Sequence, residues 1–263
     1  MDRSTVRRQA LRLCVWLGVA LIVVAALAVG YVGTPYQGSA ESISAVQDDP
    51  HVTVDRTNGG YVLQPANTEP QAGVVFYPGG RVDPDAYVSS LAPLVREANV
   101  TVVVPRMALH LAVVDYGLAE SGLGSHAADR AMAEQPDVEQ WYVGGHSLGG
   151  AMACRYAETA SESDGLLLYA SYCDVDVSDR DLSVVSVTGS ADGVLNQQTF
   201  ERNRGNLPAS TRFAELDGVN HTQFGSYTGQ DSPSATSYET AHSRLNGVVV
   251  PWLQNETTSQ VAD

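Results

Sequence analysis

Short apolar runs alternate with longer mixed stretches along most of the chain. Six runs rich in branched and aromatic residues are bounded by turn residues, which is the pattern of buried strands. They lie at 72–77, 100–104, 141–143, 166–169, 184–187 and 212–216. Helix-length stretches lie between them, at 84–98, 125–135, 148–160 and 196–206. This alternation predicts an α/β fold with a mostly parallel sheet covered by helices on both faces.

A hairpin is predicted ahead of this region. Residues 52–55 and 61–64 are short runs with β-forming side chains, and Asn58-Gly59 lies between them. An Asn-Gly pair between two such runs is typical of a tight hairpin turn.

The N-terminal segment differs from the rest of the chain. Four arginines within residues 1–12 precede a charge-free apolar run at 13–32. Twenty helical residues span about 30 Å, the thickness of a bilayer's hydrocarbon core. Because basic residues stay on the cytoplasmic side, we expect a cytoplasmic N-terminus, a single membrane-spanning helix and an extracytoplasmic domain. Secretion after cleavage of this segment as a signal is the alternative.

The remaining residues fall into three segments that differ in composition. Residues 33–49 are small and polar, as expected of a flexible tether. Residues 50–254 hold the predicted strands and helices and are long enough for one domain with its own core. The polar end of the chain, 255–263, is expected to be disordered.

The charge balance is strongly acidic. Fifteen basic residues, all of them arginine, stand against 30 Asp and Glu, giving a net charge of -15. Such a surface repels nucleic acid and anionic substrates, so neither is an expected partner. The composition resembles that of salt-adapted archaeal proteins, whose carboxylates keep the surface hydrated. A GC-rich genome would explain the missing lysine but not the excess of acid.

The three cysteines predict neither a metal site nor a disulfide framework. Cys14 lies in the apolar N-terminal run, Cys154 in a predicted helix and Cys173 at a strand end. A Cys154–Cys173 bridge is one option outside the cell, but two buried free thiols are the favoured interpretation. No pair has metal-ligand spacing, and no cofactor is expected.

One motif points to nucleophilic catalysis. The residues from Gly145 to Gly149 read Gly-His-Ser-Leu-Gly, which fits G-x-S-x-G between a predicted strand and a predicted helix. In that turn the glycines allow strand and helix to approach closely, and the serine hydroxyl is exposed at the helix N-terminus. Ser147 is therefore the predicted nucleophile; an idle serine in a glycine-rich turn is the alternative.

A serine needs a base and a group that orients the base. Asp192 follows the strand predicted at 184–187, and His221 follows the last strand. The chain order Ser147, Asp192, His221 is that of the α/β-hydrolase triad. Three other acids could replace Asp192, and five other histidines are less well placed than His221. The acids are Asp174, Asp176 and Asp217, and the histidines are His51, His110, His126, His146 and His242.

The negative charge that develops in acyl transfer needs backbone N–H donors. The amide of Leu148, directly after the nucleophile, is one candidate. The other should come from the glycine-rich loop after the strand at 72–77, where Gly80 is preferred and Arg81 is the runner-up. The Arg81 side chain could instead bind a substrate carboxylate or form a surface ion pair.

Five blocks of sequence resemble the α/β-hydrolases, in particular a branch of small serine hydrolases near the dienelactone hydrolases. They are 76–83, 104–107, 144–152, 189–192 and 220–225. The resemblance implies the α/β-hydrolase fold, hydrolysis through an acyl-enzyme, and Met107, Gln223 and Phe224 close to the substrate. Dienelactone hydrolases have cysteine as the nucleophile, so Ser147 weakens the transfer of their substrate.

The function expected from the sequence is therefore a serine hydrolase acting on a small ester, lactone or thioester. An acyltransferase with the same triad is the first alternative. A catalytically idle binding module anchored to the cell envelope is the second.

Overall fold

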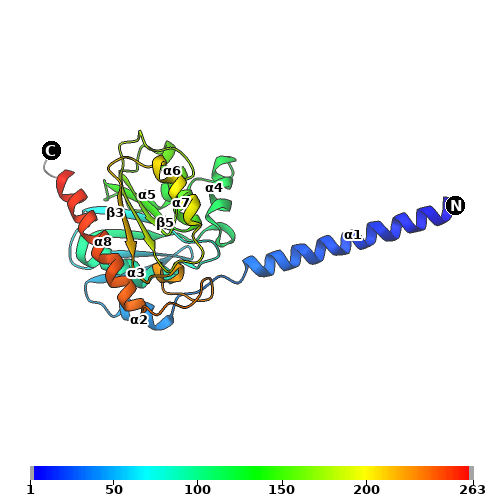
Figure 1. The fold of residues 1–263 in the computed structure, drawn as a ribbon, viewed down its shortest axis with the longest axis horizontal. Helices are drawn as coiled ribbons and strands as arrows, with labels where there is room; N and C mark the ends of the chain where they lie inside the picture. The colour runs from blue at the N-terminus through cyan, green and yellow to red at the C-terminus, as the bar shows by residue number, and fades with distance from the viewer. Residues whose placement is uncertain (1–2, 261–263) are drawn as a thin grey trace. The chain divides into compact units, whose positions relative to one another are not determined.

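The computed structural model describes residues 3–260, apart from the side chains of several residues in the N-terminal helix and of residues 259 and 260 (Figure 1). Within this range the strands form one sheet in the order β1-β2-β4-β3-β5-β6-β7-β8. The strands are β1 (Val52–Thr57), β2 (Gly60–Pro65), β3 (Ala72–Tyr77), β4 (Val100–Val104), β5 (Trp141–His146), β6 (Gly165–Tyr169), β7 (Ser183–Gly189) and β8 (Arg212–Leu216). All eight predicted strands are present, with small differences at their ends.

Strand direction follows the prediction of a mostly parallel sheet. β3 to β8 are parallel to their neighbours, whereas β2 is antiparallel to β4. β1 and β2 form the predicted antiparallel hairpin. Asn58 and Gly59 at its turn have φ of 48° and 81°. Asparagine and glycine tolerate this left-handed region better than other residues, which explains the position of the turn.

Helices cover both faces of the sheet because alternate side chains of a strand point to opposite sides. Val74 and Phe76 of β3 join one apolar cluster, and Val75 and Tyr77 join another. The first cluster includes residues of α2, α3 and α8, and the second includes residues of α4, α5 and α6. These helices are α2 (Ala40–Gln47), α3 (Val88–Ala98), α4 (Ala112–Glu120), α5 (Ala127–Ala133), α6 (Leu148–Thr159) and α8 (Tyr238–Gln260).

The helix predictions need two corrections. The stretch predicted as one helix at 84–98 is a 3₁₀ turn, η1 (Pro84–Tyr87), followed by α3. The sequence analysis predicted neither α2 nor α4, which are short and leave most of their residues at least partly exposed. The stretch at 196–206 contains α7 (Gln197–Asn203), which Asn196 caps by accepting from the Thr199 N–H at 2.9 Å.

The N-terminal region is a separate unit. Residues Arg3–Val32 form one helix, α1, with no boundary at residue 12, and the compact domain begins at Tyr36. Among the side chains that the structure describes, no helix is both long and apolar enough to cross a membrane. The span predicted at 13–32 therefore has no support from the structure. Part of that prediction, the side chains of residues 25–29 and 32, lies outside the described residues.

The predicted tether at 33–49 is wrong for most of its length. From Tyr36 onward these residues belong to the domain. The backbone of Tyr36 forms hydrogen bonds of 2.7 and 2.8 Å with Arg81 and Asp83, and Val46 of α2 joins the apolar core. Small polar composition did not reveal these contacts because backbone hydrogen bonds use no particular side chain.

The C-terminal prediction of disorder from residue 255 is also wrong. α8 continues to Gln260, and Thr257 is buried, with its hydroxyl bonded to the Leu253 carbonyl at 3.0 Å. Residues 261–263 lie outside the described part of the chain. The domain therefore extends beyond both predicted limits, 50 and 254.

Candidate active site

Ser147 occupies a sharp turn between β5 and α6. Its backbone has φ of 54° and ψ of -122°, a conformation that costs free energy for a residue with a side chain. The turn is held by two hydrogen bonds: the Ser147 N–H donates to the Tyr169 carbonyl at 2.9 Å, and the Ser171 hydroxyl donates to the Ser147 carbonyl at 2.7 Å. This is the strand-turn-helix geometry that the motif predicted.

The glycines of the motif are required by close backbone contacts. A Cβ on Gly149 would lie 2.2 Å from the Tyr77 carbonyl oxygen and 2.4 Å from that of Pro78. A Cβ on Gly145 would lie 2.6 Å from the Gly149 carbonyl carbon. Any larger residue would therefore push α6 away from the ends of β3 and β5.

His221 and Asp192 are joined as the chain order predicted. The Asp192 Oδ2 atom lies 2.8 Å from His221 Nδ1. The other oxygen, Oδ1, accepts the backbone N–H groups of Val194 and Leu195, each at 2.8 Å. Asp192 is thus fixed by its own loop. An ionised carboxylate only accepts hydrogen bonds, so it places the proton of a neutral imidazole on Nδ1 and leaves the Nε2 lone pair open.

Nε2 of His221 is the atom that would take the serine proton. It is buried and has no hydrogen-bond partner within residues 3–260. No bond to Ser147 is formed in the structure, although catalytic hydrogen bonds are often long without substrate and shorten when it binds. His221 lies at the start of η4 (His221–Phe224), which Asn220 caps by accepting from the Gln223 N–H. This capped turn sets the direction of the imidazole.

The three competing acids are engaged elsewhere. Asp174 forms a bidentate ion pair with Arg155, with distances of 2.6 to 3.2 Å. Asp176 accepts hydrogen bonds from Ser178, and Asp217 accepts one from Ser190 at 3.4 Å. The structure therefore brings Asp192, and none of these three, to His221.

His146, the variable residue of the motif, has a role that the sequence analysis missed. Its ring is fully buried and lies against His221, with centroids 4.3 Å apart. The Gly79 N–H donates to the Tyr87 hydroxyl at 2.9 Å, so that hydroxyl can donate its own proton to His146 Nδ1, also at 2.9 Å. Burial, aided by the nearby His221, holds the pKa of His146 well below its ordinary value. His146 is therefore a neutral link between the loop after β3 and the base.

The two candidate oxyanion donors lie side by side. Leu148 is the first residue of α6, and the first amides of a helix have no partner inside it. A Cβ on Gly80 would lie 3.4 Å from the Leu148 side chain, which places the two residues in contact. The runner-up donor, the Arg81 amide, is instead bonded to the His110 carbonyl at 2.7 Å. The guanidinium of Arg81 lies over the Tyr36 ring, with its Cζ atom 5.1 Å from the ring centroid.

A pocket of about 260 Å³ opens beside the nucleophile. Its walls come from the turn itself, the loop after β6 and the loop after Asp192. The lining residues are Ser147, Leu148, Ala151, Ala170, Ser171, Tyr172, Val194, Leu195 and Asn196.

The three side chains expected near the substrate do not line this pocket. Met107, Gln223 and Phe224 are all buried, at 3% exposure or less. Gln223 uses both ends of its amide inside the protein, accepting from the Asn220 N–H at 3.0 Å and donating to the Thr236 carbonyl at 2.6 Å. Phe224 stacks on His146. Gln223 thus holds the turn that carries His221, and Phe224 packs on the ring of His146.

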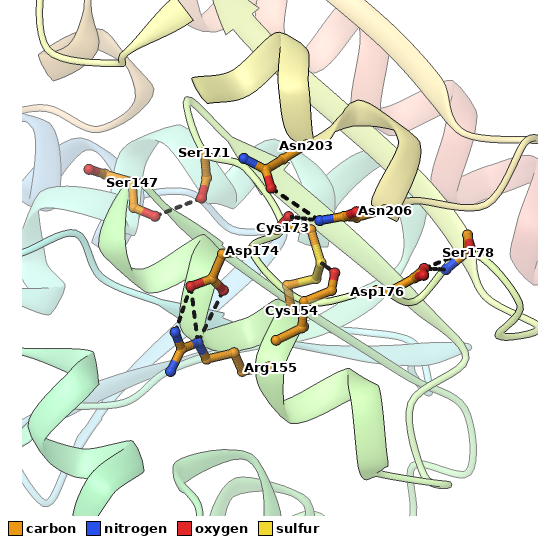
Figure 2. Close-up of a disulfide and its surroundings, with 11 residues drawn as sticks. Ser147, Cys154, Arg155, Ser171, Cys173, Asp174, Asp176, Ser178, Asn203 and Asn206 are labelled. Atoms are coloured by element: carbon orange, nitrogen blue, oxygen red, sulfur yellow. Dashed lines mark hydrogen bonds and ion pairs between the residues drawn. A yellow bond between two sulfur atoms is a disulfide. The ribbon is translucent and has the colours of Figure 1, made fainter. Parts of the chain in front are cut away.

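The prediction of free thiols at Cys154 and Cys173 is wrong. The two residues form a disulfide between α6 and the loop after β6, with Cα atoms 5.5 Å apart (Figure 2). Both are buried. Sequence could not decide this pairing, because the 19-residue separation shows nothing of how the loop returns to the helix.

The disulfide belongs to a set of contacts that fix one wall of the pocket. Ser171 bonds to the Ser147 backbone, and Asp174 pairs with Arg155 of α6 (Figure 2). The Asn206 amide donates to the Cys173 carbonyl at 3.0 Å. The wall formed by residues 170–172 is thereby tied, partly through the adjoining residues 173 and 174, to the helix that follows the nucleophile.

Among residues 3–260, no group of three His, Cys, Asp or Glu side chains is arranged to hold a metal ion. The available chemistry is that of a hydroxyl, an imidazole, a carboxylate and backbone amides.

Comparison with known proteins supports the fold and the family. The esterase domain of a Rhodothermus marinus protein aligns over 78% of this chain and 97% of its own length, with a TM-score of 0.55 and 14% identity. Est1E from Butyrivibrio proteoclasticus aligns over 81% of this chain and all of its own, with a TM-score of 0.51 and 12% identity. No curated protein sequence matches significantly. The alpha/beta hydrolase family pattern matches residues 73–243, which is more than half of the chain and spans β3 to α8. The chain therefore belongs to the alpha/beta hydrolase family.

Proposed function

We propose that this α/β-hydrolase cleaves a small carboxylic ester, lactone or thioester through an acyl-enzyme intermediate. The observation that carries the proposal is the 2.8 Å hydrogen bond between Asp192 and His221, since it leaves His221 Nε2 open as a base. Ser147 lines a pocket, and His146, the residue before it in the chain, has its ring against that of His221. The esterases among the structural neighbours share the fold and are consistent with this reaction.

The proposed reaction uses these groups in turn. His221 Nε2 takes the proton of Ser147 as the hydroxyl oxygen attacks the substrate carbonyl carbon. Asp192 stabilises the resulting imidazolium, and the Leu148 and Gly80 amides donate to the oxyanion. The carbon–oxygen or carbon–sulfur bond to the leaving group then breaks, and His221 returns the proton to that group. Water, activated by His221 in the same way, releases the acid.

The site favours a small substrate. A pocket of about 260 Å³ lies below the common range of about 300–1,000 Å³ for ligand sites. Leu148, Ala151, Val194 and Leu195 make much of its lining apolar. A short apolar acyl or alcohol group would fit this pocket better than a charged one.

Labelling with a fluorophosphonate tests the nucleophile directly, because this probe phosphonylates only an activated serine. The full chain should form one adduct, located on Ser147 by peptide mass spectrometry. The adduct should be absent from Ser147→Ala and strongly slowed in His221→Ala. A folded wild-type protein that forms no adduct, or one on another serine, would show that the assignment is wrong.

We also infer that the domain works outside the reducing cytoplasm, as the basic N-terminus suggested. The Cys154–Cys173 disulfide supports this, since such bonds persist mainly in oxidising compartments. Alkylation of protein extracted from its host under acid quench should leave both cysteines unmodified. Two alkylated thiols would contradict the inference.

A further inference from the structure

A long loop between η4 and α8 runs past the Gly80 segment and the loops that carry Asp192 and His221. It covers residues 225–237 and contains no helix or strand. The Gln230 amide approaches the Gly80 carbonyl at 3.5 Å, and the Ser232 carbonyl accepts from the Asn220 side chain at 2.7 Å. The loop is therefore in contact with both the oxyanion segment and the turn that carries His221.

One carboxylate in this loop, that of Asp231, joins the two loops that carry the acid and the base. Its Oδ2 atom accepts the backbone N–H of His221 at 3.0 Å and that of Gly193 at 3.1 Å. Its Oδ1 atom accepts the Ser232 N–H at 2.6 Å. His221 is the proposed base, and Gly193 directly follows the proposed acid, Asp192. A single oxygen atom thus binds the backbone of His221 and the backbone of the residue that follows Asp192.

The carboxylate is held in its charged form. Partial burial raises the pKa of Asp231, but the hydrogen bonds from His221, Gly193 and Ser232 outweigh that effect and lower it below the ordinary value. Hydrogen bonds to an ionised acceptor are about twice as strong as neutral ones. The fit is also close, because a Cβ on Gly193 would lie 2.9 Å from Asp231 Oδ1.

These contacts affect the distance between the two loops that carry Asp192 and His221. Asp192 and His221 lie on loops after different strands, β7 and β8, and their side-chain bond requires the two loops to keep a fixed distance. The Asp192 carboxylate is anchored to its own loop through Val194 and Leu195. Nearer the strand ends the two loops are joined directly, because the Ala191 N–H donates to the Val219 carbonyl at 3.1 Å and the Gly218 N–H donates to the Ser190 hydroxyl at 2.8 Å. Asp231 adds a connection at Gly193 and His221, next to the triad bond, and this connection does not depend on the imidazole.

We propose that Asp231 is a positioning residue for the hydrolase described above, holding the Asp192 and His221 loops in the register that base catalysis needs. The proposal rests on the proposed function for its effect on turnover. Its structural part, the connection between the loops, stands independently of any activity.

The test compares full-length Asp231→Ala and Asp231→Asn with the wild type. Turnover is measured on p-nitrophenyl acetate, and backbone hydrogen exchange is followed by mass spectrometry. Asp231→Ala should lower kcat by roughly 10- to 100-fold, because small displacements of catalytic groups are costly, and leave KM within about threefold. Exchange should become faster in peptides covering both 190–195 and 218–224. Asp231→Asn keeps one oxygen acceptor and should recover part of kcat.

The matched control is Asp176→Ala. Asp176 also accepts from a backbone and a side-chain donor in its own loop, both of Ser178, so these hydrogen bonds involve neither catalytic loop. It should change neither kcat nor exchange at 190–195 and 218–224.

Three outcomes would overturn the proposal: unchanged kcat in Asp231→Ala, unchanged exchange in either loop, or an Asp231→Asn variant with no recovery. If the wild type has no esterase activity, the proposed function fails. The exchange data then still decide whether Asp231 connects the loops.

Discussion

The imidazole of His146 lies against the imidazole of His221, with ring centroids 4.3 Å apart and both side chains buried. One of these rings must accept a proton for catalysis. A second positive charge at this distance would oppose that step, so a neutral His146 is a requirement of the proposed chemistry. The burial of His146, which lowers its pKa, meets this requirement.

This burial predicts acid sensitivity. The unfolded chain has an ordinary histidine pKa of about 6.5, whereas the folded pKa is lower. Below about pH 6.5 the unfolded state therefore binds a proton that the folded state does not. The free energy of unfolding then decreases as the pH is lowered, by at most about 1.4 kcal/mol per pH unit. Urea unfolding at several pH values should show a smaller acid loss for His146→Gln than for the wild type. His51→Gln, which changes an exposed histidine, is the control. Parallel pH curves for His146→Gln and wild type would refute the prediction.

Replacement of the triad acid should affect turnover much more than binding. Asp192→Asn keeps the size of the side chain but removes the charge that stabilises the imidazolium and fixes its tautomer. We expect kcat to fall by roughly 10³- to 10⁴-fold, the scale known for this change in a serine protease triad, with KM nearly unchanged. Asp176→Asn and Asp217→Asn are the controls and should retain at least about half of wild-type kcat. A large loss in either control would reopen the choice of acid.

Loss of the disulfide should lower stability without abolishing the nucleophile. A crosslink over 19 residues is worth about 3 kcal/mol through the entropy of the unfolded chain. The double variant Cys154→Ala/Cys173→Ala should lose about that amount in urea unfolding, and wild type reduced with dithiothreitol separates the lost bond from the lost sulfur packing. Fluorophosphonate labelling of Ser147 should persist in the folded fraction. Equal stability of oxidised and reduced wild type would contradict the prediction.

Two glycine substitutions should have opposite effects. Gly149→Ala places a methyl group 2.2 Å from the Tyr77 carbonyl oxygen, so the backbone must move, and we expect a loss of about 2 kcal/mol or more. Gly247 lies within α8, and a Cβ added there would meet no atom within 4 Å outside the backbone of its own helix. Gly247→Ala should therefore stabilise the protein by about 0.5–1 kcal/mol, the helix preference for alanine. Thermal unfolding distinguishes the two, and equal melting temperatures would argue against the close contact.

The acidic composition predicts stabilisation by salt. With a net charge of -15, the folded domain repels itself, and raising KCl from about 0.1 to 1 M shortens the screening length from about 10 to 3 Å. The melting temperature should rise over this range. Chloride is preferable to sulfate, because sulfate also stabilises proteins by exclusion from their surface. A melting temperature independent of KCl would remove the support for adaptation to high salt.

The sequence by itself determined the sheet and the chain order of the site. Strands such as β3 and β4 are buried throughout and are rich in apolar residues, as a strand covered on both faces must be. The glycines around Ser147 marked the turn, since few other residues permit such close backbone contact. Asp192 and His221 could be selected because residues after parallel strands gather at one edge of the sheet.

Only the tertiary structure decided which groups meet. The loop after β6 returns to α6 and joins Cys154 to Cys173, and the polar segment from Tyr36 forms hydrogen bonds with the domain. Gln223 holds the His221 turn through both ends of its amide, Phe224 stacks on His146, and Asp231 connects two loops from a segment without a motif. These contacts depend on loop paths and on backbone hydrogen bonds. Because every residue except proline offers the same backbone donor and acceptor, no local pattern of side chains records them.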